Sequence, residues 1–409
     1  MIKIKSAPWL ALIGSMTGCG TMELLDMMMP SEAPADLNDD TDDSDRDGDA
    51  ADADDVTNDN DSDGDGYGAL TDCDDTDELV NPDATEIPYD GIDNDCNAST
   101  LDDDLDGDGY GYAEECNDQN SDLQEPARFW EGDLPWSSVT ESTCEDARGL
   151  HVTGSLFVQE SDARDLRLLS CLCMIGEALV ITDNPDLISL SGLEGLTTGT
   201  DAIEIVNNPV LVNLAGLSQV VSLRGHLEVA ENASLTDLSG LERLQEIHDG
   251  LEVSENVNLT SVRGLPELES IGGSVSFYSN PALVNLSGLD GVEFTVNHLT
   301  ISNNPSLISV RELMRLQPFI ENLAISDNDS LADLSGLETL VLIEENLNIH
   351  NNPSLTSLQA LSSLSQVIDD VSITDNAALP TSEAEWLIND SIGQENIGGT
   401  FYINGNADD

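Results

Sequence analysis

Apolar side chains return along the second half of the chain with a fixed period of 24 residues, and each copy carries an asparagine at the same place. An apolar pair lies five and three residues before that asparagine, and a leucine lies three residues after it. Such a period is typical of a solenoid, in which each coil buries its apolar face against its neighbours. The repeated asparagines are Asn184, Asn208, Asn232, Asn256, Asn280, Asn304, Asn328, Asn352 and Asn376.

The order of residues within one copy predicts the path of one coil. The pair before the asparagine alternates with period two, as in Leu227 and Val229, which indicates a short strand with both side chains pointing inward. The asparagine, often followed by proline, indicates a turn. An asparagine at the same place in every coil can hydrogen-bond to the neighbouring backbone and form a ladder. We therefore expect these asparagines to be structural and not a binding site.

The charge of the chain narrows the choice of partners. The formal net charge is -69, and the only lysines are Lys3 and Lys5. Such a surface repels nucleic acid and anionic lipid, and favours cations or basic partners. The two lysines precede an apolar stretch, residues 7–16, that is too short to span a bilayer and reads as an export signal.

The end of this leader resembles a bacterial lipobox. The residues are Met16-Thr17-Gly18-Cys19, with methionine where leucine is usual. The resemblance implies cleavage before Cys19 and lipidation of that cysteine. The alternative is ordinary signal cleavage with Cys19 as a bystander.

Two acidic stretches have the spacing of a calcium-binding loop. In the first, carboxylates stand at positions 1, 3, 5 and 12, and glycine at position 6 permits a sharp turn. The second has the same pattern. Hard oxygen ligands without histidine favour Ca²⁺ over copper or zinc, whereas an acidic linker with recurring Asp and Gly is the alternative. The predicted ligands are Asp61, Asp63, Asp65 and Asp72 in the first loop, and Asp104, Asp106, Asp108 and Glu115 in the second.

A third candidate loop begins at Asp93, with Asp95 as its second carboxylate. It has Ala98 where glycine is expected and shares Asp104 with the second loop, so the two sites need not fill independently.

Four short motifs in residues 59–120 carry a family resemblance. They are Asp-Gly-Asp-Gly-Tyr-Gly at 63–68, Asp-Cys-Asp-Asp at 72–75, Val-Asn-Pro at 80–82 and Tyr-Asp-Gly-Ile-Asp-Asn-Asp-Cys at 89–96. The segment resembles the "putative metal-binding motif" family of Asp-rich, Cys-containing modules in bacterial surface proteins. The family's usual Asp-Gly after the second cysteine is Asn97-Ala98 here, which weakens the third site. The resemblance implies a metal module at the cell surface.

Six further cysteines precede the regular repeats, and an even number in an exported chain indicates disulfides. Fifteen pairings are possible for six cysteines. Zinc is the alternative, but no paired Cys or His spacing supports it. These cysteines are Cys73, Cys96, Cys116, Cys144, Cys171 and Cys173.

The repeat itself resembles the receptor L-domain, a right-handed β-helix of leucine-rich character. The resemblance lies in Cys-x-Ile-Gly-x-x-Leu-x-Ile at 173–181 and in Leu-x-Ile-x-x-Asn-x-x-Leu-x-x-Leu-x-Gly-Leu in the coils. Ordinary leucine-rich repeats have leucine two residues after the asparagine, and here it is three. This spacing favours the L-domain form over a helix-backed horseshoe. The resemblance implies a mainly β solenoid of about ten coils, which is either one long array or two fused arrays.

One face of the solenoid is a candidate surface for a partner. Glu204, Glu228 and Glu252 point outward on three consecutive coils, and Tyr278 lies on the next. Carboxylates stacked about 5 Å apart repel by about 0.8 kcal/mol per pair in water, so a cation or a basic partner could relieve the repulsion. A solvated acidic face is the alternative.

No pattern in the sequence is typical of an enzyme. The five histidines lack metal-ligand spacing, and neither a Gly-x-Ser-x-Gly turn nor a phosphate-binding loop occurs. We expect a non-enzymatic, lipid-anchored protein of the bacterial outer membrane or cell surface that binds calcium and recognises a protein or glycan, with no nucleic acid partner. The alternative is an envelope spacer or a cation-sequestering protein without a specific partner.

The same patterns divide the chain into five segments. They are a signal peptide at 1–18, an acidic tether at 19–58, a calcium-loop module at 59–125, a cap with a first coil at 126–178 and the solenoid with its C-terminal cap at 179–409.

Overall fold

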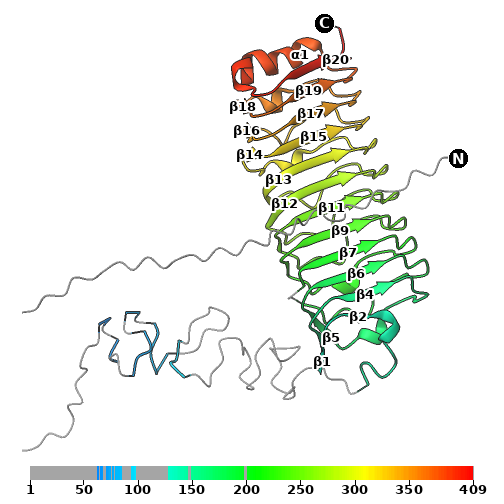
Figure 1. The fold of residues 1–409 in the computed structure, drawn as a ribbon, viewed down its shortest axis with the longest axis vertical. Coiled ribbons are helices and arrows are strands. Elements are labelled where there is room, and N and C mark those ends of the chain that lie inside the picture. The colour runs from blue at the N-terminus through cyan, green and yellow to red at the C-terminus, as the bar shows by residue number, and fades with distance from the viewer. Residues whose placement is uncertain are drawn as a thin grey trace, which may run out of the picture. The chain divides into compact units, whose positions relative to one another are not determined.

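The computed structural model describes residues 62–63, 65–67, 71–74, 76–77, 79–84, 94–97, 128–145, 149–197 and 200–408. From residue 128 onward the chain winds through a stack of short parallel strands (Figure 1). Equivalent residues of neighbouring coils pair directly, for example Leu227 with Leu251, which are 24 positions apart. The predicted mainly β solenoid with 24-residue coils is therefore confirmed. No helix in the described part of the chain is long and apolar enough to cross a membrane.

Most strands form one 14-stranded sheet along the length of the solenoid. Its main path runs through β2 (Leu134–Pro135), β4 (Leu156–Gln159), β6 (Ala178–Thr182), β7 (Ala202–Val206), β9 (His226–Ala230), β11 (Gly250–Ser254), β12 (Ser270–Tyr278), β13 (Glu293–Ser302), β15 (Asn322–Ser326), β17 (Leu347–His350), β19 (Val371–Thr374) and β20 (Phe401–Asn404). Short strands β8 (Ser222–Leu223) and β10 (Glu246–Ile247) extend it from β12. The sheet thus begins within the segment predicted as the cap.

Two smaller sheets lie on other sides of the coils. One has the order β1 (Arg128–Trp130), β3 (Leu150–Val152) and β5 (Leu172–Ile175), and the other β14 (Phe319–Ile320), β16 (Leu342–Ile343) and β18 (Gln366–Val367). Both sheets are parallel, as the winding of a solenoid requires.

The alternation in each strand places the core inside the coils. Leu227 and Val229 are fully buried, while Glu228 between them faces outward and is half-buried. Burying one such side chain contributes about 1.5–3 kcal/mol relative to leaving it exposed. Because the register repeats, the buried leucines of successive coils form one continuous core.

The asparagine ladder takes the predicted form. The Asn232 side-chain amide donates a hydrogen bond to the Ile205 carbonyl oxygen at 2.7 Å, and its backbone N–H donates to Asn256 Oδ1 at 2.9 Å. The same two contacts recur from coil to coil, and all nine asparagines are fully buried. Each therefore satisfies backbone groups that the turn would otherwise leave unpaired inside the protein.

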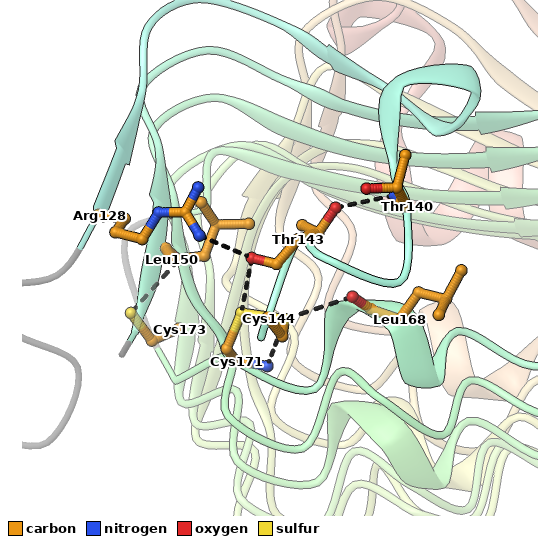
Figure 2. The surroundings of a disulfide bond; sticks show 8 residues. All are labelled: Arg128, Thr140, Thr143, Cys144, Leu150, Leu168, Cys171 and Cys173. Carbon is orange, nitrogen blue, oxygen red and sulfur yellow. Dashed lines mark hydrogen bonds between the residues drawn. A yellow bond between two sulfur atoms is a disulfide. The ribbon is translucent and has the colours of Figure 1, made fainter. Parts of the chain in front are cut away.

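Disulfide-bonded cysteines lie in the first coils. Cys144 is bonded to Cys171, and Arg128 donates a hydrogen bond to the Thr143 carbonyl oxygen at 3.2 Å (Figure 2). Cys144 Sγ lies 3.3 Å from the Leu168 carbonyl oxygen. Since a disulfide sulfur carries no hydrogen, this is a packing contact.

The other end of the solenoid closes with α1 (Thr381–Trp386) and a π-helical continuation, Leu387–Ile392. The last coil is delayed by this insertion. Asn376 donates its backbone N–H to Asn406 Oδ1 at 3.0 Å across 30 residues instead of 24.

Candidate metal centre and the exposed sheet face

Three of the predicted calcium ligands come together. Asp63, Asp65 and Asp72 each offer a carboxylate oxygen within 4.8 Å of the other two. Asp72 is buried, at 7% exposed, and the other two are half-buried. Carboxylate oxygens at this separation can coordinate a single hard cation.

Local hydrogen bonds hold each of these carboxylates in place. Asp63 Oδ1 accepts the Asp65 backbone N–H at 3.3 Å, and Asp65 Oδ1 accepts the Tyr67 N–H at 2.9 Å. Asp72 Oδ1 accepts the Asp74 N–H at 2.9 Å in the same way. These are turns in which an aspartate bonds to the backbone two residues on. They leave the second oxygen of each carboxylate for other contacts.

The second oxygens of Asp65 and Asp72 are buried and have no hydrogen-bond partner in the described part of the chain. Burying an ionised carboxylate oxygen without a partner is costly. A bound cation would remove that cost at both oxygens. The donor set therefore fits a metal ion, and in particular one that prefers oxygen ligands.

A disulfide and two hydrogen bonds brace the segments around these aspartates. Cys73, directly after Asp72, is bonded to Cys96. The Asn81 backbone N–H donates to the Asn94 carbonyl oxygen at 2.8 Å. Tyr67 is hydrogen-bonded to the Asp83 carboxylate, and this bond is the main cause that raises the pKa of its hydroxyl. The sequence pattern named the carboxylates but missed these bracing contacts of Asp83 and Asn94, because they join segments outside one loop.

The cysteines of the described part are not zinc ligands. Cys73, Cys96, Cys144 and Cys171 form the two disulfides, and Cys173 is disulfide-bonded as well. A bonded cysteine has no thiolate to offer a metal. The expected disulfides are therefore present, and the zinc alternative fails for these five residues.

Of the remaining predicted ligands, the structure describes Asp95 alone. Asp95 accepts the Asn97 backbone N–H at 3.0 Å and belongs to neither potential ligand cluster in the described residues. The other predicted ligands lie outside those residues, as does the predicted lipidation site Cys19. They are Asp61, Asp93, Asp104, Asp106, Asp108 and Glu115.

The structure also places the residues of the predicted partner face, while their role as a partner surface stays a prediction. Glu204, Glu228 and Glu252 occupy the same register position on β7, β9 and β11 and are half-buried. His226 Nε2 lies 3.6 Å from Glu204 Oε1. The Tyr278 hydroxyl donates a hydrogen bond to Glu252 Oε1 at 2.6 Å. Side chains of the solenoid itself therefore contact both ends of this glutamate ladder.

The electrostatics of the ladder reflect its crowding. Burial, together with the charges of Glu252 and Glu204, raises the pKa of Glu228. The nearby Glu204 carboxylate is the main cause that raises the pKa of His226. Burial and the hydrogen bond to Glu252 raise the pKa of Tyr278 to about 12. The charged form of Glu228 is therefore disfavoured at the centre of the ladder.

Comparison with known proteins finds a metal-binding motif that shares one residue, Asp72, with the carboxylate cluster. Residues 72–104 match the family described as "Putative metal-binding motif", whose label names copper binding (Cu-binding MopE). A search of curated proteins found no match to the chain. The matched segment includes Asp72 and the Cys73–Cys96 disulfide. The chain therefore combines a metal-binding motif at residues 72–104 with a β-solenoid of 24-residue coils, an arrangement consistent with a binding protein of the surface type.

Proposed function

We propose that this chain is a non-enzymatic, lipid-anchored protein of the bacterial surface, in which calcium orders the Asp- and Cys-rich module and the solenoid presents a recognition surface. The observation that carries the proposal is the pair of buried oxygens on Asp65 and Asp72 that have no hydrogen-bond partner among the described residues, within the three-carboxylate cluster. The export and anchoring part rests on the leader and on Cys19.

The donor chemistry supports calcium over the copper of the family label. The converging ligands are carboxylate oxygens, which suit hard cations such as Ca²⁺, whereas Cu(I) prefers thiolate or thioether and Cu(II) favours imidazole nitrogen. The neighbouring cysteine sulfurs are committed to a disulfide. No histidine belongs to the potential ligand groups in the described residues.

Calorimetric titration of the full chain with Ca²⁺ tests the proposal. We expect the Asp65→Asn/Asp72→Asn double variant to lose a saturable site. The matched control is Asp74→Asn/Asp77→Asn, which removes two exposed carboxylates from the same segment and should keep that site. The control separates specific ligation from a change in net charge.

Any one of three results would contradict the proposal that calcium is the ligand. One is a Ca²⁺ affinity unchanged by Asp65→Asn/Asp72→Asn. Another is tight Cu(I) or Cu(II) binding in a parallel titration, lost in that variant, without a saturable Ca²⁺ site. The third is many weak sites that both double variants reduce equally, which would support cation sequestration by an acidic chain.

A further inference from the structure

A hollow at the N-terminal end of the long sheet has the lining of a ligand site. Its volume is about 570 Å³, which lies within the ~300–1,000 Å³ typical of small-molecule sites. Trp136 and Phe157 supply aromatic surface, and Gln159 and Asp162 supply polar groups. We call this hollow the Trp136 cleft.

The solenoid fold brings these residues together from two coils. Pro135 on β2 pairs with Phe157 on β4, so both project from the outward face of the sheet. Trp136 follows β2 directly, is half-buried and packs against the core. Figure 1 shows β2 and β4 at the N-terminal end of the sheet, away from the C-terminal cap.

The loop that forms the rest of the cleft is held by the asparagine ladder. The buried Ser161 donates its backbone N–H to Asn184 Oδ1 at 3.0 Å, and its hydroxyl accepts the Ala163 N–H at 2.9 Å. A ligand would therefore meet a largely pre-formed wall, which reduces the entropy cost of binding. The exposed side chains of Gln159 and Asp162 extend from this rigid loop.

The polar groups of the cleft are available to a ligand. The Trp136 indole N–H, the Gln159 amide and the Asp162 carboxylate make no side-chain hydrogen bond within the described part of the chain. Together they supply donors and an acceptor beside an aromatic surface. An aromatic ring has a negative face that attracts C–H groups, and a carboxylate accepts strong hydrogen bonds from hydroxyls. A pyranose ring offers C–H groups on its faces and hydroxyls on its rim.

The charge around the cleft selects among sugars. Glu160 and Asp162 line it, and the whole chain carries a formal net charge of -69. Phosphorylated or uronic-acid polymers would be repelled. From the aromatic surface, the free polar groups and this charge, we propose that the Trp136 cleft binds a short stretch of a neutral oligosaccharide.

Another hollow in the solenoid does not have this chemistry. It has a volume of about 660 Å³ and is lined by four glutamates and Arg315, with no aromatic residue. It offers charge without a surface for sugar stacking. The contrast identifies the two aromatic residues in the lining as the feature specific to the Trp136 cleft.

The inference depends on the recognition part of the proposed function and names its ligand class. The test titrates the full chain with cellohexaose and N-acetylchitohexaose, followed by calorimetry and tryptophan fluorescence, with polygalacturonate and poly-lysine in parallel. We expect saturable binding of at least one neutral hexasaccharide. The affinity should fall at least tenfold in Trp136→Ala and Gln159→Ala, with no response to polygalacturonate.

Tyr402→Ala is the matched control, because Tyr402 is an exposed aromatic residue on the outward face of the same sheet at its other end. It should leave the affinity unchanged. Gln159 is exposed, so its variant decides the question even if Trp136→Ala fails to fold. No saturable binding of either neutral sugar, equal affinity in the cleft variants, or a cleft-dependent affinity for poly-lysine alone would overturn the proposal.

Performing the sugar titration in EDTA keeps the two proposals separate. A failure there concerns the cleft alone, whereas failure of the calcium titration concerns the carboxylate cluster alone.

Discussion

The chain contains two groups of three carboxylates that differ in their sequence spacing and in their arrangement in space. Asp63 and Asp65 converge with Asp72, and two of the three have a buried oxygen with no hydrogen-bond partner in the described residues. Glu204, Glu228 and Glu252 form a flat ladder instead, with one residue per coil. Loop spacing produces convergence, and solenoid spacing produces parallel stacking.

The difference shows why acidity alone does not define a metal site. At the ladder, His226 and Tyr278 contact the terminal glutamates, and burial, together with the charges of Glu252 and Glu204, raises the pKa of Glu228. A raised pKa relieves repulsion by favouring the neutral form. In the converging cluster the simplest relief is a cation that several oxygens share. Stacked carboxylates therefore lower the stability of a fold, whereas converging carboxylates can bind an ion.

The largest expected effect concerns the rates at which two disulfides are reduced, one beside the carboxylate cluster and one in the solenoid. We compare the chain with calcium at a hundred times its Kd and the chain after calcium is chelated. Chelation should increase the rate of reduction of Cys73–Cys96 by on the order of a hundredfold, because the bound ion stabilises only the ordered module. Cys144–Cys171 in the solenoid should be unaffected. Timed alkylation with mass spectrometry would measure both rates. Equal acceleration of the two disulfides would remove the distinction between the regions.

The next largest effect should come from the asparagine ladder, which stabilises the solenoid without a cation. Asn256→Ala removes a bond to the Val229 carbonyl oxygen and an acceptor for the Asn232 N–H, both buried. We expect a loss of about 2 kcal/mol in the free energy of unfolding, measured by urea denaturation. Calcium should not restore it.

Asn258→Ala, two positions away, is the control for this variant. Asn258 is exposed, although its amide donates to the Ala233 carbonyl oxygen at 2.7 Å. Its loss should cost less than about 0.5 kcal/mol. Similar losses for both variants would show that the buried ladder is not special.

A third prediction concerns a buried carboxylate that lacks convergent neighbours. Glu312 is 1% exposed, and neither of its oxygens has a hydrogen-bond partner in the described residues. Arg311 Nε lies 3.5 Å from Oε1. The equivalent positions four coils before and two coils after carry Gly216 and Ala360. Glu312→Ala should therefore raise the free energy of unfolding by about 1 kcal/mol.

Arg311→Met gives the opposing measurement in the same denaturation assay. It leaves the buried carboxylate without its cation, so it should lower the stability of the solenoid. Calcium could instead stabilise the solenoid and lose this effect in Glu312→Ala. That result would make Glu312 a second metal ligand and would contradict the contrast between converging and isolated carboxylates.

The smallest expected effect is at the centre of the glutamate ladder. Glu228→Gln should stabilise the solenoid at pH 7 and low salt by about 0.5 kcal/mol, since it removes repulsion from two neighbours in a screened, half-exposed setting. Urea denaturation at two salt concentrations would measure the gain. It should shrink at high salt, and a gain independent of salt would contradict the electrostatic cause.

The pH dependence of Glu228 follows from its raised pKa. Its protonated form is favoured in the folded state, so its contribution to stability is present below the pKa of the unfolded chain and is lost as pH rises through the folded pKa. Stability of the unmodified chain should therefore improve relative to Glu228→Gln as the pH is lowered through that interval. The opposite trend would show that the charge of Glu228 is not the source of the repulsion.

Features that depend on local spacing could be predicted from the sequence. The period of 24 residues predicted the coil, its inward pair and the asparagine ladder, because each of these contacts repeats at a fixed offset. The spacing of Asp63, Asp65 and Asp72 predicted their convergence, since a turn of so few residues restricts where their side chains can point.

Contacts between segments that are distant in the sequence could be seen in the tertiary structure alone. Six cysteines allow fifteen pairings, and the fold selects Cys73 with Cys96 and Cys144 with Cys171. Stacking of the coils brings His226 and Tyr278 into contact with the glutamates. It also places Trp136 and Phe157 in the lining of one hollow. The physical reason is that local spacing fixes the direction of a side chain, whereas the partner it meets depends on which coil packs beside it.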